Sequence, residues 1–239
     1  MTRRRAILVM AKRPLAGQTK TRLSPPLSPE QAAALYHCFL ADTLDVVRDV
    51  AASLPGVCGY IAHAPVDADS FFARIAPDFD LVPQQGDDLG ERLDTVLRHC
   101  IDAGFEQVLA INSDGPTLPA ANIVAAFQRL DQPQVDAVFG PCEDGGYYLI
   151  GLSQAHSRLV RDVQMSTPYV LRDTLAVAAE EGVRTSLLPT WYDVDTVDEL
   201  RRLMAELKRP GVAGARHTRD YLAQFEAADW ARVDRQGST

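Results

Sequence analysis

A loop rich in basic residues follows the first apolar run of the sequence. Residues 11–23 read AKRPLAGQTKTRL, directly after the apolar run 6–10 and before a helical pattern that begins at Ser28. Lys and Arg side chains bind phosphate oxygens, and small residues let backbone N–H groups approach a ligand. A solvated run of charges is the alternative, but the position between a buried strand and a helix favours phosphate binding. The residues that we expect to bind a nucleotide here are Ala11, Lys12, Pro14, Gly17, Lys20 and Arg22.

The same loop lacks the glycine spacing of two common nucleotide sites. It matches neither a P-loop nor a GxGxxG turn, so the sequence does not indicate an ordinary kinase or dehydrogenase. HExxH and GxSxG patterns do not occur either. Zinc hydrolysis and serine esterase chemistry are therefore not supported.

A second polar loop, INSDGPTLP, follows the apolar run QVLAI at 107–111. Asp114 then lies just beyond the carboxyl end of a strand, where Gly115 and Pro116 favour a tight turn. A carboxylate that faces a diphosphate is a natural ligand for Mg²⁺ or Mn²⁺, whereas capping a helix is the other common use of such an Asp. Opposite the basic loop the metal site is favoured, and we expect Asp114 to be catalytic through it.

Two acidic residues and two glycines follow the fifth predicted strand. The stretch GPCEDGGYYLIGL, residues 140–152, places Glu143 and Asp144 directly before Gly145 and Gly146. An acidic pair could act as a general base, and adjacent glycines let a substrate lie along the chain, although a hairpin turn with solvated acids would have the same sequence. We expect Glu143 and Asp144 to be catalytic, and Gly145, Gly146 and Tyr147 to bind an acceptor.

A further acidic stretch, WYDVDTVDEL, begins at Trp191. Asp193 or Asp195 could complete the metal site, because a lone carboxylate rarely holds Mg²⁺ firmly. Asp195 or Thr196 could instead cap the helix that follows, with Glu199 near the positive end of its dipole. The sequence leaves open which of the two aspartates binds metal.

Two other stretches contribute candidate residues. QQGDDLGERL, residues 84–93, places Gly90 and Arg92 at a loop-to-helix junction, where they could touch a base or a sugar. MSTPYVL, residues 165–171, has mainly the pattern of a helix start, with Ser166 and Thr167 before Pro168. We include Gly90 and Arg92 among the nucleotide-binding residues and Ser166 among those that bind the acceptor.

The elements that must position these loops alternate along the whole chain. Apolar, β-branched runs predict strands at 6–10, 57–62, 79–82, 107–111, 135–139, 147–150 and 183–188. Helical patterns begin at Ser28 and lie near 89–103, 120–130, 168–181 and 197–208. Such alternation predicts an α/β fold with a mainly parallel central sheet and helices on both faces. Ligands of such a sheet bind beyond the carboxyl ends of the strands, where these loops lie.

Length and composition are those of an ordinary globular protein. Of 239 residues, 46% are hydrophobic and 23% are charged, so we expect one domain over 1–209 and a tail over 210–239 with one helix near 218–231. The net charge of −8 argues against nucleic acid or an anionic membrane as a partner. The four cysteines form no CxxC pair, and no signal peptide or membrane span is found, so we expect a cytoplasmic protein. Oligomeric state stays open.

The order of these motifs is similar to that of a known family. KRPLAGQTKTRL, GDDLGERL, SDGPTLP, EDGGYYLIGL and DVDTVDEL together resemble the DUF2064 family, or radical-SAM/selenodomain-associated transferase 1 family, over residues 6 to about 200. The resemblance implies a GT-A-type, Rossmann-like three-layer sandwich and a likeness to the guanylyltransferase of coenzyme F420 biosynthesis. Gly115 and Met165 depart from the family pattern, which expects Cys or another small residue and Trp at these positions.

The resemblance also implies an activity. It favours a metal-dependent glycosyltransferase that uses a nucleotide-diphosphate sugar, Mg²⁺ or Mn²⁺, and a small-molecule acceptor of unknown identity. A nucleotidyltransferase, which joins an NTP to a phosphorylated substrate and releases pyrophosphate, shares the same nucleotide site and is the alternative. A non-catalytic nucleotide sensor is a hypothesis of a different class. The sequence does not identify the base, the sugar or the acceptor.

Overall fold

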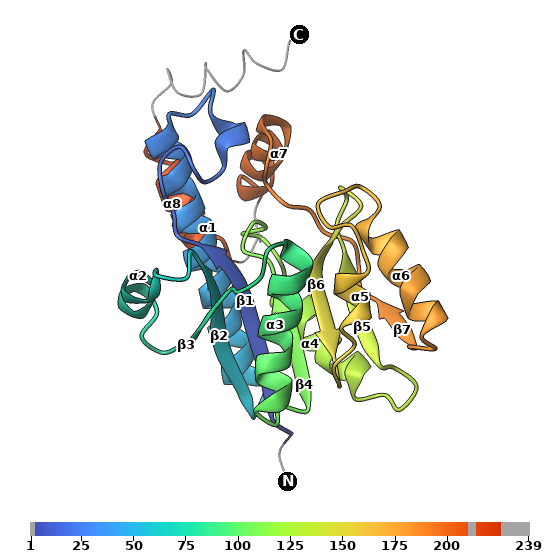
Figure 1. Cartoon of the computed structure of the whole chain (residues 1–239). Helices are drawn as coiled ribbons and strands as arrows, with labels where there is room; N and C mark the ends of the chain where they lie inside the picture. The colour runs from blue at the N-terminus through green and yellow to red at the C-terminus, as the bar shows by residue number, and fades with distance from the viewer. Residues whose placement is uncertain (1–2, 210–213, 226–239) are drawn as a thin grey trace.

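A seven-stranded sheet forms the centre of the molecule. The computed structural model describes residues 3–209 and 214–225 (Figure 1). Across the sheet the strands are β3 (Asp80–Pro83), β2 (Val57–Ala64), β1 (Arg5–Lys12), β4 (Gln107–Ile111), β6 (Tyr147–Leu152), β5 (Ala137–Pro141) and β7 (Thr185–Leu187). All neighbouring strands are parallel except β6, which runs antiparallel to both β4 and β5.

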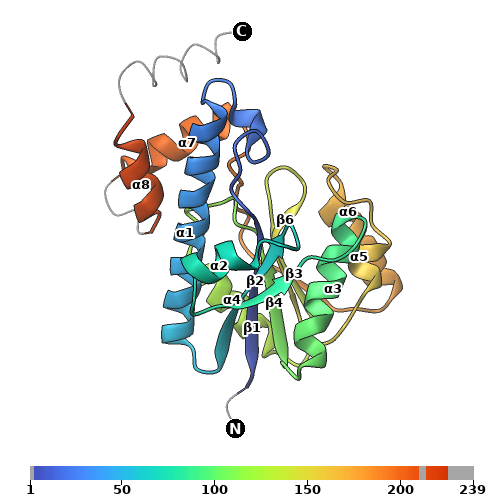
Figure 2. The same cartoon turned by 60° about the vertical axis from the view of Figure 1, so that its left-hand side comes forward.

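Helices cover both faces of this sheet, so the chain has three layers (Figures 1 and 2). One face packs against α1 (Pro29–Ser53), α2 (Asp69–Ile75) and α4 (Ala120–Leu130). The other packs against α3 (Leu89–Asp102), α5 (Arg158–Arg161) and α6 (Val170–Glu180). In the described part of the chain, no helix combines the length and the apolar character needed to cross a membrane.

Strand β1 shows why the sheet is buried on both faces. Its side chains alternate between two apolar clusters, with Ile7 and Val9 in the first and Ala6 and Leu8 in the second, and all four are fully buried. A strand between two helical layers needs such a continuous apolar run. The α/β fold with a mainly parallel sheet is thus confirmed.

All seven predicted strands and all the long predicted helices are present, with shifts of a few residues at their ends. For example, β5 begins at Ala137 instead of Val135, because Val135 closes a turn onto the carbonyl of Gln132. Three short helices were not predicted from the sequence: α2, α5 and the 3-10 helix η1 (Thr21–Leu23), which span seven, four and three residues. Segments this short hold too little of a helical period to be recognised. Of the helix predicted near 218–231, residues 226–231 lie outside the described residues.

The antiparallel strand β6 brings a further turn to the edge where the parallel strands end. Pro141 at the end of β5 pairs with Tyr147 at the start of β6, and Leu149 of β6 pairs with Ile111 at the end of β4. The turn over 142–146 therefore lies at the same edge as the loops after β1 and β4. This edge collects every acidic and basic motif that the sequence analysis singled out.

A third apolar cluster lies beyond this edge and supports its loops. It joins α1 to α7 (Val197–Leu207) and α8 (Arg216–Leu222) and contains the fully buried Phe39 of α1. It also includes Leu23 and Val194 from the loops themselves. Asp42 of α1 accepts the backbone N–H groups of His217 and Thr218 at 2.8 and 2.9 Å, which fixes the start of α8. Residues 214–225, which the sequence analysis assigned to a tail, thus pack on α1.

We predict that Phe39→Ala destabilises the protein by about 3–5 kcal/mol, because Phe39 is fully buried and truncation leaves a cavity. Denaturation in urea gives the free energy of unfolding. Leu187→Ala is the control, since Leu187 is 47% exposed and its truncation should change this free energy by no more than about 0.5 kcal/mol. Equal, small effects of both changes would show that the third cluster does not contribute to stability.

Candidate active site

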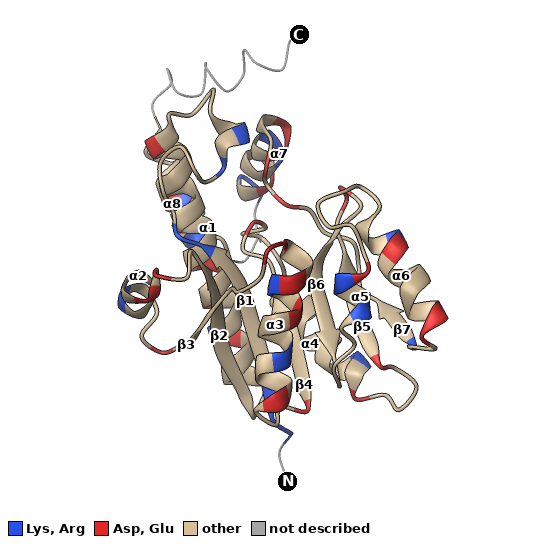
Figure 3. Ribbon diagram, in the orientation of Figure 1, with Lys and Arg blue, Asp and Glu red and all other residues tan. Residues whose placement is uncertain are grey.

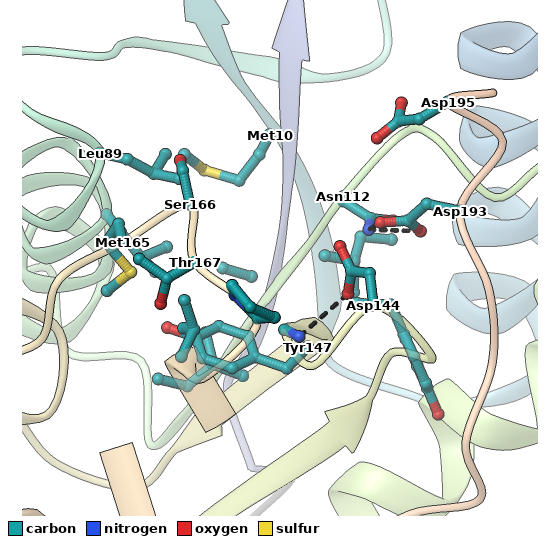
Figure 4. Close-up of a pocket in the computed structure, with 18 of the residues that line it drawn as sticks. Met10, Leu89, Asn112, Asp144, Tyr147, Met165, Ser166, Thr167, Asp193 and Asp195 are labelled. Carbon is teal, nitrogen blue, oxygen red and sulfur yellow. Dashed lines mark hydrogen bonds between the residues drawn. The ribbon is translucent and has the colours of Figure 1, made fainter. Parts of the chain in front are cut away.

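Three adjoining cavities line the carboxyl edge of the sheet. The central cavity, of about 450 Å³, lies between β4, the 142–146 turn and the segment 165–170 (Figure 4). The loop cavity, of about 460 Å³, lies under the loop after β1. The outer cavity, of about 560 Å³, extends from the loop after β1 to the loops after β2 and β3. Their key lining residues are Tyr147, Met165 and Asp193 (central), Lys20 and Asp114 (loop), and Arg13, Gly86 and Arg92 (outer).

These cavities form one continuous cleft because they share walls. The residues common to the central and loop cavities are Met10, Arg22, Leu89, Asn112, Ser166 and Asp195. Those common to the loop and outer cavities are Lys12, Gln18, Thr19 and Gln84. One end of the cleft is therefore basic, and the other is acidic and apolar. A nucleotide at the basic end and a second molecule in the central cavity would meet at the first shared wall.

Lys20 forms the central ion pairs of the cleft. Its Nζ atom lies 2.5 Å from an oxygen of Asp114 and 2.6 Å from an oxygen of Asp195, and only 5% of its side chain is exposed. Burial alone would lower the pKa of Lys20, but the two carboxylates outweigh it and hold the pKa above its usual value. The loop after β1, the loop after β4 and the segment before α7 thus meet at one ammonium group. Figure 3 shows the acidic residues, in red, on the segment that leads into α7.

The backbone of Lys20 adopts a conformation that aims this side chain. Lys20 has φ 51° and ψ 41°, in the left-handed region, and it directly precedes η1. For a residue with a side chain this conformation costs on the order of 1 kcal/mol. The two ion pairs offset that cost, since a well-placed charged hydrogen bond contributes about 1.5–3 kcal/mol.

A buried hydroxyl network connects the loop after β1 to the loop after β4. The hydroxyl of Tyr36 accepts the backbone N–H of Lys12 at 3.0 Å and lies 2.8 Å from the hydroxyl of Ser113. Ser113 in turn donates to the carbonyl of Met10 at 2.9 Å. Burial, reinforced by the nearby Asp114, raises the pKa of Tyr36 to about 12, so its hydroxyl keeps its proton at neutral pH. The network fixes both loops relative to α1.

Asp193 lies in the central cavity and is oriented by Asn112. The side-chain N–H₂ group of Asn112 donates to both carboxylate oxygens of Asp193, at 2.8 and 2.7 Å (Figure 4). Burial, together with the charge of Asp114, raises the pKa of Asp193 to about 7. Asp193 therefore exchanges a proton near neutral pH, unlike an ordinary aspartate.

Thr196, and not Asp195, caps α7, which resolves one of the questions that the sequence left open. Thr196 caps α7 in a capping box with Glu199, whose carboxylate also accepts the backbone N–H of Asp195 at 2.8 Å. The side chain of Asp195 is left to face Lys20 and, at 3.9 Å, the guanidinium of Arg22. The same short segment thus starts a helix and supplies the cleft with a carboxylate.

The acidic pair in the 142–146 turn is split between two sides of the turn. Asp144 lines the central cavity, and one of its oxygens accepts the backbone N–H of Gly146 at 2.9 Å. Glu143 instead pairs with Arg202 of α7 at 2.5 Å, which lowers the pKa of Glu143. The structure therefore brings Asp144 to the cleft and directs Glu143 to the surface between the turn and α7.

Gly145 joins this turn to the segment on the other side of the cavity. It has φ +91°, and a Cβ atom built on it would lie 2.0 Å from the carbonyl oxygen of Pro168. Its own carbonyl accepts the N–H of Leu171 at 3.0 Å. Ser166, also in the left-handed region with φ 61°, lines both the central and the loop cavity. A side chain at position 145 would force the two segments apart.

Most of the residues expected from the sequence line the cleft. These are Ala11, Lys12, Lys20, Arg22, Arg92, Asp114, Asp144, Gly146, Tyr147, Ser166, Asp193 and Asp195. The other expected residues, Pro14, Gly17, Gly90, Glu143 and Gly145, do not line any of the three cavities. Gly90 has a packing role, since a Cβ atom on it would lie 2.2 Å from the carbonyl oxygen of Val160 in α5. Helix α3 can lie this close to α5 because position 90 has no side chain.

Several residues of the site, among them Tyr36, Gln84 and Asn112, were not predicted from the sequence. Tyr36 and Gln84 line the loop cavity, and Asn112 orients Asp193. Gln84 donates its side-chain N–H₂ group to the carbonyls of Ala62 and Ala11, at 2.7 and 3.3 Å, which holds the amide in place at the cavity wall. Tyr36 falls on the apolar face of a helix and has the pattern of a core residue. Asn112, directly after a strand and within the INSDGP motif, was recognisable.

The acidic residues of the cleft suit a metal ion that is shared with a phosphate. In the part of the chain that the structure describes, no three acidic, His or Cys side chains are arranged to hold a metal by themselves. Asp114 and Asp195, however, both direct an oxygen at the same point, the Nζ atom of Lys20. Mg²⁺ and Mn²⁺ are commonly bound by one or two carboxylates and by phosphate oxygens, so this donor set fits such an ion.

The sequence matches a known protein family and a curated relative. The family model described as "Uncharacterized protein conserved in bacteria (DUF2064)" matches residues 47–167, a little over half of the chain. The chain is also 24% identical over 213 residues to a 2-phospho-L-lactate guanylyltransferase from Methanothermobacter thermautotrophicus, covering 86% of this chain and 85% of that protein.

Solved structures share the fold. A crystal structure from Desulfovibrio desulfuricans G20, of a protein provisionally named a nucleotide-diphospho-sugar transferase, is 29% identical, with a TM-score of 0.85 over 98% of both chains. 4-Diphosphocytidyl-2C-methyl-D-erythritol synthase from Anaerococcus prevotii DSM 20548 is 12% identical, with a TM-score of 0.55 over 87% of this chain and 97% of that one. That second likeness shows the fold alone. The chain belongs to the DUF2064 family, has the fold of the nucleotide-diphospho-sugar transferases and is an enzyme of the transferase class.

Proposed function

We propose that the protein is a nucleotidyltransferase that joins the nucleoside monophosphate of an NTP to a small phosphorylated acceptor. The sequence favours glycosyl transfer, with this activity as the alternative. Nucleotidyl transfer is favoured by the number of cationic side chains that line the loop and outer cavities, namely Lys12, Arg13, Lys20, Arg22 and Arg92. A triphosphate carries more charge than the diphosphate of a sugar nucleotide and makes use of more cations. The similarity to a guanylyltransferase supports the same choice.

The proposed reaction is a displacement at phosphorus. An oxygen of the acceptor phosphate attacks the α-phosphorus of the NTP, and the bond from that phosphorus to the oxygen bridging the β-phosphate breaks. Pyrophosphate leaves with the bonding electrons. No proton has to be removed from the attacking oxygen, because the acceptor phosphate is already ionised. Enzymes accelerate such transfers mainly by positioning the reactants and by stabilising charge, and this cleft is equipped for both.

Each wall of the cleft has a role in this proposal. Lys12 and Lys20 bind the phosphates in the loop cavity, and Arg22 at the shared wall neutralises charge near the transferred phosphorus. Asp114 and Asp195 would hold Mg²⁺ or Mn²⁺, which supplies charge neutralisation on the phosphate oxygens. The central cavity, which Asp144 and Ser166 both line, receives the acceptor.

Glycosyl transfer is the second candidate, and the central cavity favours it. That cavity has space for a sugar beside the phosphate region, and Asp144 could accept the proton of an acceptor hydroxyl. In this reaction the acceptor oxygen would attack the anomeric carbon and a nucleoside diphosphate would leave. The name of the Desulfovibrio protein points to the same class of donor.

The test is to incubate the protein with each NTP in the presence of Mg²⁺ or Mn²⁺ and a panel of phosphorylated acids that includes 2-phospho-L-lactate. We expect acceptor-dependent release of pyrophosphate from one NTP. UDP-, GDP- and dTDP-sugars are tested separately. Sugar transfer without pyrophosphate release from any NTP would establish glycosyl transfer instead. Nucleotide binding that Asp114→Asn leaves unchanged, with no turnover of any donor, would establish a sensor.

We predict that Arg22→Ala weakens binding of the preferred nucleotide by about 1–3 kcal/mol, because it removes a charged contact to phosphate. Isothermal titration calorimetry gives the affinity. Arg172→Ala on α6 is the matched control, since both side chains are 68% exposed and both changes remove one positive charge. Equal affinities of the two variants would place the phosphates elsewhere.

Asp193 gives a prediction about pH. Its pKa is raised from 3.8 to about 7 in the folded protein, so between these values the folded state keeps a proton that the unfolded state has released. Stability from this group therefore falls as pH rises through that window. The free energy of unfolding of Asp193→Asn, relative to that of wild type, should therefore rise by up to about 3 kcal/mol from pH 5 to pH 8. Urea denaturation at both values measures this, and a difference that does not change with pH would contradict the assignment.

A further inference from the structure

Lys20 occupies the position where Asp114 and Asp195 converge. One oxygen of each carboxylate lies within 2.6 Å of its Nζ atom, so these two oxygens are at most about 5 Å apart. A divalent ion held by the same two oxygens would lie between them at about 2.0–2.2 Å from each. The ammonium group and the metal ion would then be in contact, and both are positive. The two cations cannot occupy this point together.

The surroundings of Lys20 fix the ammonium group against the carboxylates. The ring centres of Tyr36 and Phe39 each lie 5.8 Å from Nζ, and the side chain is almost fully enclosed. Arg22, the other cation near Asp195, is 3.9 Å away and largely exposed, so it leaves that carboxylate accessible. Lys20 also lines the loop cavity, where the proposed function places phosphate oxygens. A phosphate there would offer the ammonium group an alternative anionic partner within the same cleft.

We propose that Lys20 and the divalent metal ion compete for Asp114 and Asp195, so that the metal enters the cleft together with the nucleotide, whose phosphates draw Lys20 away. The inference rests on the proposed function for its metal and its phosphates. It goes beyond it by assigning Lys20 two successive sets of partners, carboxylates before binding and phosphates afterwards. Free metal ions are excluded by the same residue that later binds the donor.

The physical basis is a balance of charge. Two carboxylates and one ammonium carry a net charge of −1, and a divalent ion added to them would be repelled at short range by the ammonium group. Removal of the ammonium leaves two converging carboxylates, which attract a divalent ion. A nucleotide has the same effect without removing Lys20, because its phosphates supply negative charge for both cations.

The test measures binding of Mn²⁺ alone, without nucleotide, by electron paramagnetic resonance of the free ion. We expect Lys20→Met to bind Mn²⁺ at least about tenfold more tightly than wild type. Lys12→Met is the matched control, because Lys12 lines the same cavity but no ion pair joins it to a carboxylate among the described residues. It makes the same change in charge, and we expect less than about a threefold effect. Asp114→Asn added to Lys20→Met should abolish the gain.

The outcomes separate this inference from the proposed function. If wild type and Lys20→Met bind Mn²⁺ equally and Asp114→Asn weakens both, the metal site exists and the competition does not. If Lys12→Met tightens binding as much as Lys20→Met, the effect is a general one of charge, and the competition is again overturned. If neither wild type nor Lys20→Met binds Mn²⁺, with or without an NTP, both the competition and the metal-dependent function fail.

Thermal stability provides a second measurement that does not need tight binding. Lys20→Met should melt below wild type in the absence of metal, because it leaves the carboxylates unpaired. Addition of Mn²⁺ should raise the melting temperature of the variant by several degrees and that of wild type much less. Lys20→Gln, which keeps polar hydrogens for the carboxylates, serves if the methionine variant does not fold. A melting temperature that Mn²⁺ changes equally in variant and wild type would overturn the competition.

Discussion

A buried ammonium group requires partners, and this requirement organises the whole cleft. Taking Lys20 out of water is costly unless charged oxygens replace its hydration, and Asp114 and Asp195 do so. Each of the three residues comes from a different loop, so the ion pairs also fix the loops relative to one another. The strained backbone of Lys20, the capping box before α7 and the hydroxyl network at Tyr36 all support this one contact.

The topology of the sheet explains why three distant segments can meet there. Parallel strands place all their following loops at one edge, and the antiparallel β6 begins at that edge instead of ending there. The turn before β6 consequently faces the loops that follow β1 and β4. The third apolar cluster then holds α7 and α8 against α1, which keeps Asp195 within reach of Lys20. The cleft is thus a product of strand direction and of packing outside the sheet.

The sequence predicted the elements and the polar loops well because both depend on local patterns. Apolar runs identified every strand, and the position of Asp114 after one of them identified the acidic wall. What it could not predict was the direction of individual side chains. Glu143 and Asp144 are adjacent and chemically alike, yet Arg202 draws only Glu143 out of the cleft. Tyr36 has the spacing of a core residue, and only its contacts with Lys12 and Ser113 show that it belongs to the site.

Two glycines that do not line the central cavity set its width. Gly145 lets the 142–146 turn lie against the backbone of Pro168, which holds these two sides of the cavity together. Gly90 lets α3 lie against the backbone of Val160, directly after Leu89, which lines the cavity. Both glycines contact backbone atoms, and backbone cannot adopt another rotamer to accommodate a larger side chain at either position. Residues that do not line the cavity thus help to set the size of the molecule that it can hold.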